Sequence, residues 1–259
     1  MILLGAGNMG TNLACALREA GVRFDCIYSR SLENARELAG KVGAGQYTDS
    51  MEAVQSFCEK VTAKNQVVLY CLKDSVLREV LERIDAPEAL HIHTAGSIGL
   101  EVFEGTNKPH AGVLYPFQSV TKSHVLSFKE VPVFVEATTS EDKVRVKDLA
   151  EQISSRVFEI NSEMRRRLHV AGVFANNFTN CMYAIAGEIL QPTGLPEDVL
   201  LPLIDETAAR VHQMHARQAQ TGPAKRFDEN VMEAHCDLLQ DPELQEIYRL
   251  VSRNIHRHS

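Results

Sequence analysis

The amino-acid sequence predicts an α/β fold, in which a mostly parallel sheet is followed by a smaller all-α domain. Up to about residue 160, short apolar runs alternate with amphipathic segments, as strands alternate with helices in a helix-covered parallel sheet. From Asn161 onward the strand pattern is absent and only helical periodicity continues. We therefore expect two domains, residues 1–161 and 162–259.

The individual elements follow from the same patterns. The expected strands are the apolar runs Met1–Leu4, Phe24–Tyr28, Val67–Leu72, Leu90–His93, Val113–Tyr115, Val131–Val135 and Val157–Ile160. Amphipathic segments between them predict helices at Leu32–Val42, Met51–Thr62 and Ser75–Ile84. In the second part, proline and glycine breakers separate the expected helices Ser162–Leu190, Glu197–Ala216, Asp228–Leu239 and Pro242–His256.

The composition restricts the classes of protein to be considered. The chain has 259 residues, of which 44% are hydrophobic and 24% charged, as in a globular protein with a substantial core. Its apolar runs are well short of the roughly 20 residues of a membrane-spanning helix. The formal charge of -7 argues against nucleic-acid binding, which needs a basic face. Six cysteines without a C-x-x-C pair predict reduced, mostly buried thiols in a cytoplasmic protein.

A glycine-rich turn lies between the first strand and the helix that follows it. Gly5, Gly7 and Gly10 form the pattern G-x-G-x-x-G, with Asn8 and Met9 inside it. The first glycine permits a tight turn, the second lets the backbone approach a pyrophosphate, and the third lets helix and strand pack closely. Free N–H groups at the start of the helix favour phosphate. The motif indicates a Rossmann-type nucleotide site, and the alternative is a purely structural turn.

The end of the second expected strand selects among nucleotides. An NAD site usually has an Asp or Glu there that binds the ribose 2′-hydroxyl. This chain has Ser29, Arg30 and Ser31 instead, and the next carboxylate is Glu33. A guanidinium between two hydroxyls suits a 2′-phosphate, so NADP(H) is the expected cofactor. FAD and the methyl donor S-adenosylmethionine, which have no 2′-phosphate, are the alternatives that this residue disfavours. The alternative for Arg30 is a solvated loop cation.

Later strand ends supply further polar residues. In an open α/β sheet, ligands bind beyond the carboxyl ends of the strands. Lys73 and Thr94 are expected beside the cofactor, Ser97 is expected as a catalytic residue that positions the substrate, and Gln118 is expected as a substrate ligand. The alternative for each of them is a capping or turn role.

The long helix of the second part carries an unusual polar face. His169, Asn176 and Asn180 follow the spacing i, i+7, i+11 and so share one side of an α-helix. Burying such groups is costly unless they meet partners or a ligand. His169 is a candidate proton donor, Asn176 a second catalytic group and Asn180 a substrate ligand. The alternative is a hydrogen-bonded core histidine with interhelical amide contacts.

Two other groups of residues are weaker candidates. Arg165, Arg166 and Arg167 are expected to form a solvated start of the long helix, with attraction of an acidic substrate as the alternative. His212 and His215 share a helix face, but no cysteine or carboxylate pattern completes a metal site, so no metal is expected.

Several motifs together carry a family resemblance, namely GAGNMG, IYSRS, HTAGS, LYPFQS, LHVAGVFANNFTN and QTGPAKRFD. Over essentially the whole chain they resemble Rossmann-like proteins whose C-terminal half is the domain of unknown function 2520. That family is similar in architecture to pyrroline-5-carboxylate reductase and to the 6-phosphogluconate and 3-hydroxyacid dehydrogenases, whose helical C-terminal domain often dimerises. The resemblance implies an NADP-dependent oxidoreductase that acts on a small molecule as a homodimer.

One departure from the hydroxyacid dehydrogenases affects the chemistry. Those enzymes carry a catalytic lysine one turn before an Asn-Asn pair. Here Asn176 and Asn177 are present, but Val173 occupies the earlier position, and His169 is the nearest substitute. We therefore expect a reductase of a small ketone or imine. The alternative is an inactive NADP(H)-binding or NADP(H)-sensing protein, which the missing lysine favours.

Overall fold

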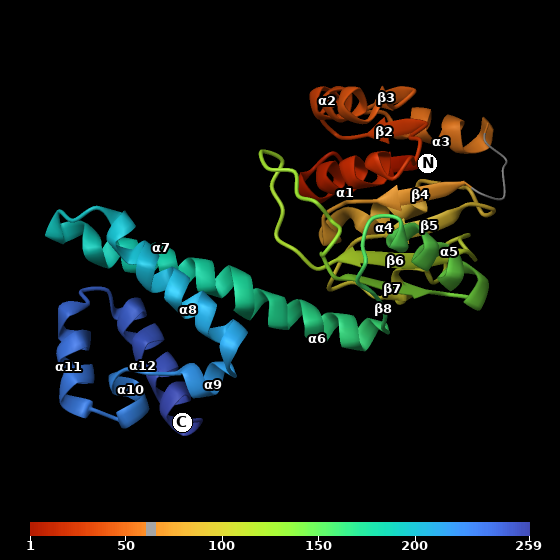
Figure 1. The fold of residues 1–259 in the computed structure, drawn as a ribbon. Coiled ribbons are helices and arrows are strands. Elements are labelled where there is room, and N and C mark those ends of the chain that lie inside the picture. Colours follow the sequence, from red (N-terminus) through yellow and green to blue (C-terminus); the bar gives the residue numbers. More distant parts are fainter. Residues whose placement is uncertain (61–65) are drawn as a thin grey trace. The chain divides into compact units, whose positions relative to one another are not determined.

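One sheet organises the first part of the chain in the computed structural model, which describes residues 1–60 and 66–259 (Figure 1). Its strands are β1 (Ile2–Leu4), β2 (Cys26–Tyr28), β3 (Gln46–Thr48), β4 (Val67–Tyr70), β5 (Leu90–His93), β6 (Ala111–Pro116), β7 (Val133–Ala137) and β8 (Val157–Glu159). They lie in the order β3-β2-β1-β4-β5-β6-β7-β8, and among these described strands only β6 and β7 pair antiparallel. The expected mostly parallel sheet is confirmed, and its first six strands have the order 3-2-1-4-5-6 of a Rossmann fold.

Strand β3 is not predicted by the apolar pattern. Its residues Gln46, Tyr47 and Thr48 are exposed or half-buried, because β3 forms an edge of the sheet. Parallel pairing with β2 holds it in place, with Cys26 opposite Gln46 and Tyr28 opposite Thr48. Because backbone hydrogen bonds hold this strand, its side chains need not be apolar, and the sequence shows no alternation of apolar and polar residues there.

Helices cover both faces of the sheet. They are α1 (Asn8–Glu19), α2 (Leu32–Val42), α3 (Met51–Lys60), α4 (Asp74–Glu82), α5 (Ser140–Glu151) and the short 3-10 helix η1 (Leu100–Phe103). Apolar residues of α1, α2 and α5 pack on one face, and those of α3 and α4 on the other. Strand β1 shows the alternation, since Leu3 belongs to the first cluster and Ile2 and Leu4 to the second. The predicted helix Met51–Thr62 corresponds to α3, and its last two residues lie outside the described residues.

Local sequence signals fix where α2 begins and ends. The hydroxyl of Ser31 accepts a hydrogen bond of 3.3 Å from the backbone N–H of Asn34 and so caps the first turn. Gly43 follows the last turn with a φ of 64°, a conformation that favours glycine. These signals place Ser29 to Ser31 between β2 and α2, at the carboxyl edge of the sheet where such folds bind ligands.

The segment after β8 is helical throughout, but its middle is not an α-helix. It consists of α6 (Ser162–Gly172), the π-helical turn η2 (Val173–Phe178) and α7 (Thr179–Leu190). The sequence predicts one uninterrupted α-helix here. Because a π turn contains an extra residue, the α-helical spacing that placed Asn180 on the face of His169 and Asn176 does not hold across it. Single π turns are frequent at functional sites, and this one contains Asn176.

The chain divides into two units within this helical segment, Met1–Asn177 and Phe178–Ser259. Residue 161, the boundary expected from the sequence, immediately precedes α6. Helix α6, which carries His169, and all of η2 except Phe178 therefore belong to the unit that contains the sheet. The assignment of residues 162–259 to one domain stays a prediction.

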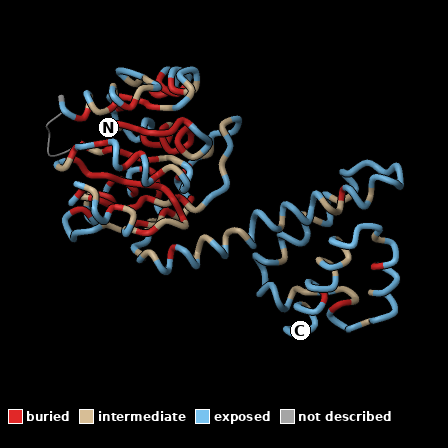
Figure 2. Tube along the Cα trace, turned by 180° about the vertical axis from the view of Figure 1, so that it is seen from behind, coloured by how far each residue is buried: buried red, intermediate tan, exposed pale blue. Residues whose placement is uncertain are grey.

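The second unit, all of which is described, contains helices and no strand. Besides α7 they are η3 (Gln191–Thr193), η4 (Glu197–Leu200), α8 (Leu201–Gln213), α9 (Ala216–Ala219), α10 (Pro223–Arg226), α11 (Glu229–Leu238) and α12 (Pro242–Arg257). The predicted helix Glu197–Ala216 is thus divided into shorter pieces. Figure 2 shows that most of this unit's trace is exposed, and its buried residues are Gly187, Ala224, Cys236 and Ser252.

Arg165 corrects the expectation that the run of three arginines is a solvated helix start. It is fully buried and forms an ion pair with Glu136 of β7, and its Nη2 donates to the carbonyl oxygen of Ile98 at 2.6 Å. The backbone N–H and the hydroxyl of Ser162 each donate to the Glu136 carboxylate at 2.8 Å. This network fixes the start of α6 on the sheet. The next two arginines are exposed, as expected.

Candidate functional site

The larger candidate site is a pocket of about 420 Å³ at the carboxyl edge of the sheet. The turn after β1, the end of β2 and the turn after β4 line it, because β1 lies between β2 and β4. The strand order reverses between β1 and β4, which is where such folds bind nucleotides. The lining includes six of the predicted cofactor residues, namely Gly5, Gly7, Ser29, Arg30, Ser31 and Lys73.

The three glycines of the first turn differ in what surrounds them. Gly5 has a φ of +111°, and a Cβ there would collide with the carbonyl oxygen of Cys71. A Cβ at Gly10 would collide with the carbonyl oxygen of Gly5, so this glycine allows α1 to approach the turn. A Cβ at Gly7 would meet no atom within 4 Å of the described structure. Gly7 therefore leaves open space in the pocket lining, as a backbone that receives a pyrophosphate requires.

The charge of the pocket lining favours an anion. Its charged residues are Arg30, Lys73, Glu79, Arg83 and Lys122. Cations therefore outnumber the carboxylate, and the end of β2 provides only hydroxyls and the guanidinium. The pocket lacks, within the described residues, an acidic group at the position where NAD-binding folds hold the ribose 2′-hydroxyl.

The remaining four predicted cofactor residues lie beside this pocket rather than in its described lining. Asn8, Met9 and Gly10 form the first turn of α1. Thr94 is buried directly after β5, and its hydroxyl donates to the carbonyl oxygen of Tyr70 at 3.4 Å. Their contact with a cofactor stays a prediction.

A second pocket, of about 160 Å³, begins where β6 ends. Its lining comes from the end of β6, the connection that follows and the segment from α6 to η2, with the residues Tyr115, Phe117, Gln118, Ser119, His169, Gly172, Val173, Ala175, Asn176 and Asn177. The structure thus brings together three predicted residues, His169, Asn176 and Gln118. The described lining offers amide, hydroxyl, imidazole and aromatic groups, and no carboxylate, lysine or arginine.

Tyr115 and His169 form a hydrogen-bonded pair in this pocket. Tyr115 Oη and His169 Nδ1 are 3.0 Å apart, and the rings meet edge to face. Burial raises the pKa of the Tyr115 phenol, which the charge of Arg165 lowers and that of Asp74 raises further. The phenol therefore keeps its proton at neutral pH. Because Tyr115 occupies Nδ1, Nε2 is the imidazole nitrogen that the described residues leave for a substrate.

Two glycines allow α6 to lie close to the strand ends. A Cβ at Gly96, in the turn after β5, would lie 2.6 Å from His169 Nδ1 and 2.7 Å from Tyr115 Cζ. A Cβ at Gly172 would lie 2.6 Å from Phe117 Cε2. All three distances are shorter than any normal contact of a Cβ atom. The position of the tyrosine–histidine pair therefore depends on the absence of a side chain at residue 96.

Two predicted residues lie apart from these pockets. The hydroxyl of Ser97 donates a short hydrogen bond to the carboxylate of Asp74, at the start of α4. Its proton is therefore engaged, and Ser97 can only accept a hydrogen bond from a ligand. Asn180 is exposed and belongs to the second unit. The structure does not test the roles predicted for Ser97 and Asn180.

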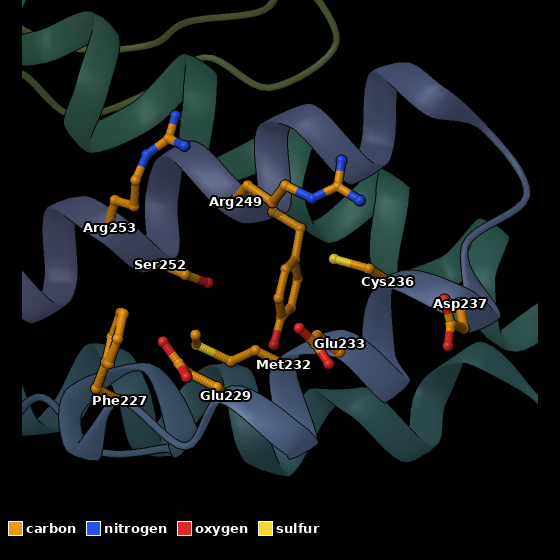
Figure 3. Close-up of a pocket in the computed structure, with 10 residues that line it drawn as sticks. Phe227, Glu229, Met232, Glu233, Cys236, Asp237, Arg249, Ser252 and Arg253 are labelled. Carbon is orange, nitrogen blue, oxygen red and sulfur yellow. The ribbon is translucent and has the colours of Figure 1, made fainter.

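The second unit has cavities of its own. One, of about 350 Å³, lies between α11 and α12, with Glu229 and Glu233 on one side and Arg249 and Arg253 on the other (Figure 3). It contains none of the predicted site residues. In the described part of the chain, no three His, Cys, Asp or Glu side chains are grouped to hold a metal ion. No described helix is long and apolar enough to cross a membrane.

Among the lining residues that the sequence does not predict as site residues, two are important for the proposals below. The sequence predicts Tyr115 as the last residue of a strand, and its place at a carboxyl strand end is a usable signal for a site residue. Lys122 lines the larger pocket from the connection between β6 and β7, and its Nζ donates to Asn34 Oδ1 at 2.8 Å. Lys122 is 92 residues beyond Arg30, and no local pattern links the two.

Two family models match the chain. The model described as "NADP oxidoreductase coenzyme F420-dependent" matches residues 1–95. The model of a domain of unknown function, DUF2520, matches residues 131–255. No protein of curated function gives a significant match.

Solved structures resemble the chain over nearly its whole length. The "putative NADP oxidoreductase BF3122" from Bacteroides fragilis is 46% identical, with a TM-score of 0.87 and coverage of 99% of this chain and 97% of that one. A reductive aminase from Aspergillus terreus, in complex with NADPH and ethyl-5-oxohexanoate, is 13% identical, with a TM-score of 0.72 and coverage of 99% and 96%. A 1-pyrroline-5-carboxylate reductase from Streptococcus pyogenes is 14% identical, with a TM-score of 0.62 and coverage of 99% and 97%. At these low identities the last two show the fold alone.

Proposed function

The chain belongs to a family of NADP-dependent oxidoreductases, and from this premise we propose that it reduces a small ketone or imine with NADPH. The observation that carries the proposal is the Tyr115–His169 pair. It places an acid–base group in a pocket whose described lining has no carboxylate, lysine or arginine, at the same sheet edge as the larger pocket. A small uncharged substrate fits this lining better than an acidic one.

The residues of the larger pocket fit NADP(H). The open face of Gly7 and the first amides of α1 suit the pyrophosphate, and Arg30 between two hydroxyls suits the 2′-phosphate. NADPH, when bound, supplies the hydride. The proposed contacts are Gly5, Gly7, Asn8, Met9, Gly10, Ser29, Arg30, Ser31, Lys73 and Thr94.

His169 supplies the proton in the proposed reaction. Reduction of a C=O or C=N bond leaves an oxygen or nitrogen that must gain a proton, and histidine exchanges protons near neutral pH. As an imidazolium, His169 donates from Nδ1 to Tyr115 Oη and from Nε2 to the substrate. The ring then keeps the proton on Nδ1, where Tyr115 holds it in place. Tyr115 is therefore a positioning residue, since it acts through His169.

Two polar side chains of this pocket, and two predicted residues outside it, are proposed as contacts of the substrate. Asn176 shares the pocket with His169 and is suited to orient the reacting group, while Gln118 offers an amide from the connection after β6. Ser97 contributes acceptor lone pairs, because its proton is engaged by Asp74. Asn180 is proposed as a further substrate ligand.

The experiment that tests this function follows NADPH oxidation with a panel of small ketones, each with and without an amine that forms the imine. The expected result is turnover of at least one compound, a loss of about 100-fold or more in kcat for His169→Ala, and an unchanged Kd for NADPH. An unaffected rate in His169→Ala would remove the proton-donor assignment. A wild-type protein that binds NADPH but oxidises it with no compound would support the sensing protein instead.

We also propose that the chain forms a homodimer through its helical unit. Many of the large exposed hydrophobic residues lie there, including Leu201, Leu203, Leu238 and Val251, whereas few residues of the unit are buried. A cavity of about 380 Å³ between α7, α10, α11 and α12 has an almost wholly apolar lining. Exposed apolar surface of this kind is typical of a protein–protein interface. In a symmetric dimer the same surface of each copy contacts its counterpart on the other copy.

A reducing, cytoplasmic location completes the proposal. All six cysteines are free, which is typical of a protein kept in a reducing compartment. Cys26, Cys58 and Cys236 are buried, as expected, whereas Cys181 is exposed on α7.

A further inference from the structure

The connection between β6 and β7, residues 117–132, reaches back over α1 (Figure 1). Asn12, which is fully buried on α1, binds this connection through both polar atoms of its side-chain amide. Asn12 Nδ2 donates to the carbonyl oxygen of Thr121 at 2.9 Å, and Asn12 Oδ1 accepts from the N–H of Leu126 at 3.0 Å. The backbone N–H of Lys122 donates to Asn8 Oδ1 at 3.2 Å. The first turn of the nucleotide-binding helix thus fixes the backbone of Lys122.

The side chain of Lys122 extends into the larger pocket. It lines that pocket together with Ser29, Arg30 and Ser31, and its Nζ donates to Asn34 Oδ1 at 2.8 Å. The residue is half-buried, and no carboxylate of the described residues lies within ion-pair distance of its Nζ. An amide is a weak partner for an ammonium group, which is expensive to hold away from water without an anion. Lys122 is therefore a fixed cation of the pocket without a carboxylate in ion-pair contact among the described residues, and Glu37, whose pKa is lowered by Lys41 and more weakly by Lys122, interacts with it only at longer range.

We propose that Lys122 is a second cation for the 2′-phosphate of NADP(H), opposite Arg30. The inference rests on the proposed function, because it assumes that the adenosine ribose lies at the end of β2. In folds of this kind the 2′-substituent meets the residues after the second strand, and Lys122 shares the lining there. Arg30 supplies a planar guanidinium from the turn after β2, and Lys122 supplies a point charge from the distant connection between β6 and β7. Preference for NADP(H) over NAD(H) then depends on two cations rather than one.

The test compares NADPH and NADH by calorimetric titration of the intact protein. The variants are Lys122→Met, the charge-retaining Lys122→Arg, Arg30→Ala, and Lys129→Met as a control on an exposed lysine of the same connection. Lys122→Met is expected to weaken NADPH binding by roughly tenfold to a hundredfold, the strength of a hydrogen bond to a charged group, and to leave NADH binding unchanged. Lys122→Arg is expected to retain most of the preference, and Lys129→Met all of it.

Three outcomes overturn the proposal. If Lys122→Met weakens NADPH and NADH equally, Lys122 only holds the connection through Asn34. If Lys122→Met keeps the wild-type preference while Arg30→Ala loses it, the cofactor site is as proposed but Lys122 is not part of it. If the wild-type protein has no preference for NADPH, the proposed 2′-phosphate site itself is wrong, and this inference is wrong with it.

Discussion

At the scale of single residues, the proposed chemistry depends on side chains that meet from distant parts of the chain. Tyr115 ends β6 and His169 lies on α6, 54 residues later, yet their polar atoms are 3.0 Å apart. The contact exists because Gly96 leaves room for both rings. A residue outside the described lining of both pockets thus controls the geometry of the proposed proton donor, and geometry of this kind has large effects on rate.

Substitution of Gly96 tests that control. Gly96→Ala is expected to lower kcat at least tenfold, because the added Cβ displaces His169 or Tyr115, and to leave the Kd for NADPH unchanged. The measurement is kcat with the best substrate of the panel, alongside calorimetric titration with NADPH. The matched control is Gly40→Ala in α2, where a Cβ meets no described atom within 4 Å and kcat should not change. A Gly96→Ala protein with wild-type kcat would show that the pair tolerates displacement.

Some of these residues were predictable from the sequence and others were not. The glycine turn and Arg30 are local signals, since their spacing from the first two strands is fixed by the βαβ unit. His169 and Asn176 were predictable as polar residues on an apolar helix. The Tyr115–His169 contact and the position of Lys122 arise from tertiary packing over long sequence separations, which no local pattern encodes.

At the scale of elements, β5 carries two histidines that are completely buried. His91 Nδ1 lies 2.8 Å from Tyr70 Oη, and His91 Nε2 lies 2.8 Å from the carbonyl oxygen of Ala86. Burial lowers the pKa of His91 to about 4, and burial together with the charge of Arg165 lowers that of His93 to about 3. Both rings are therefore neutral in the folded protein under conditions where the unfolded chain would protonate them.

The sign of the pH effect follows from these pKa values. Below pH 6.5, the ordinary histidine value, the unfolded state binds more protons than the folded state, so acid favours unfolding. Between pH 7 and pH 5 each histidine should remove on the order of 2 kcal/mol from the free energy of unfolding. Urea unfolding at these two pH values, for the wild type and for His93→Gln, measures the effect. A variant whose stability falls as steeply as that of the wild type would contradict the assignment to His93.

Helices and strands are predictable from the sequence where burial produces a regular pattern of apolar residues or where capping residues bound the element. Helix α2 lies at the predicted residues 32–42, because an N-cap serine and a C-terminal glycine bound an amphipathic run. Strand β3 was missed, because backbone pairing at a sheet edge needs no apolar side chains. The π turn η2 was also missed, since apolar periodicity does not reveal one additional residue in a turn.

At the scale of the whole molecule, the helical unit should join two copies. Light scattering is expected to give twice the chain mass of 28.8 kDa. Val251→Glu, on α12 in the lining of the apolar cavity, should shift the protein toward the monomer, because it buries a charge in the proposed interface. Val144→Glu, on a similarly exposed valine of α5, is the matched control and should stay dimeric. A monomeric wild-type protein, or a Val251→Glu protein that remains fully dimeric, would contradict the proposed interface.

The most direct test of the central claim is calorimetric titration with NADPH, NADH and S-adenosylmethionine in parallel, on the wild type and on Arg30→Ala. We expect tight binding of NADPH, weaker binding of NADH, no binding of S-adenosylmethionine, and a loss of roughly tenfold or more in NADPH affinity on Arg30→Ala. Equal affinity for NADPH and NADH, or binding of none of the three, would contradict this expectation. In the second case the glycine turn would have only a structural role, and the proposed reductase activity would be wrong.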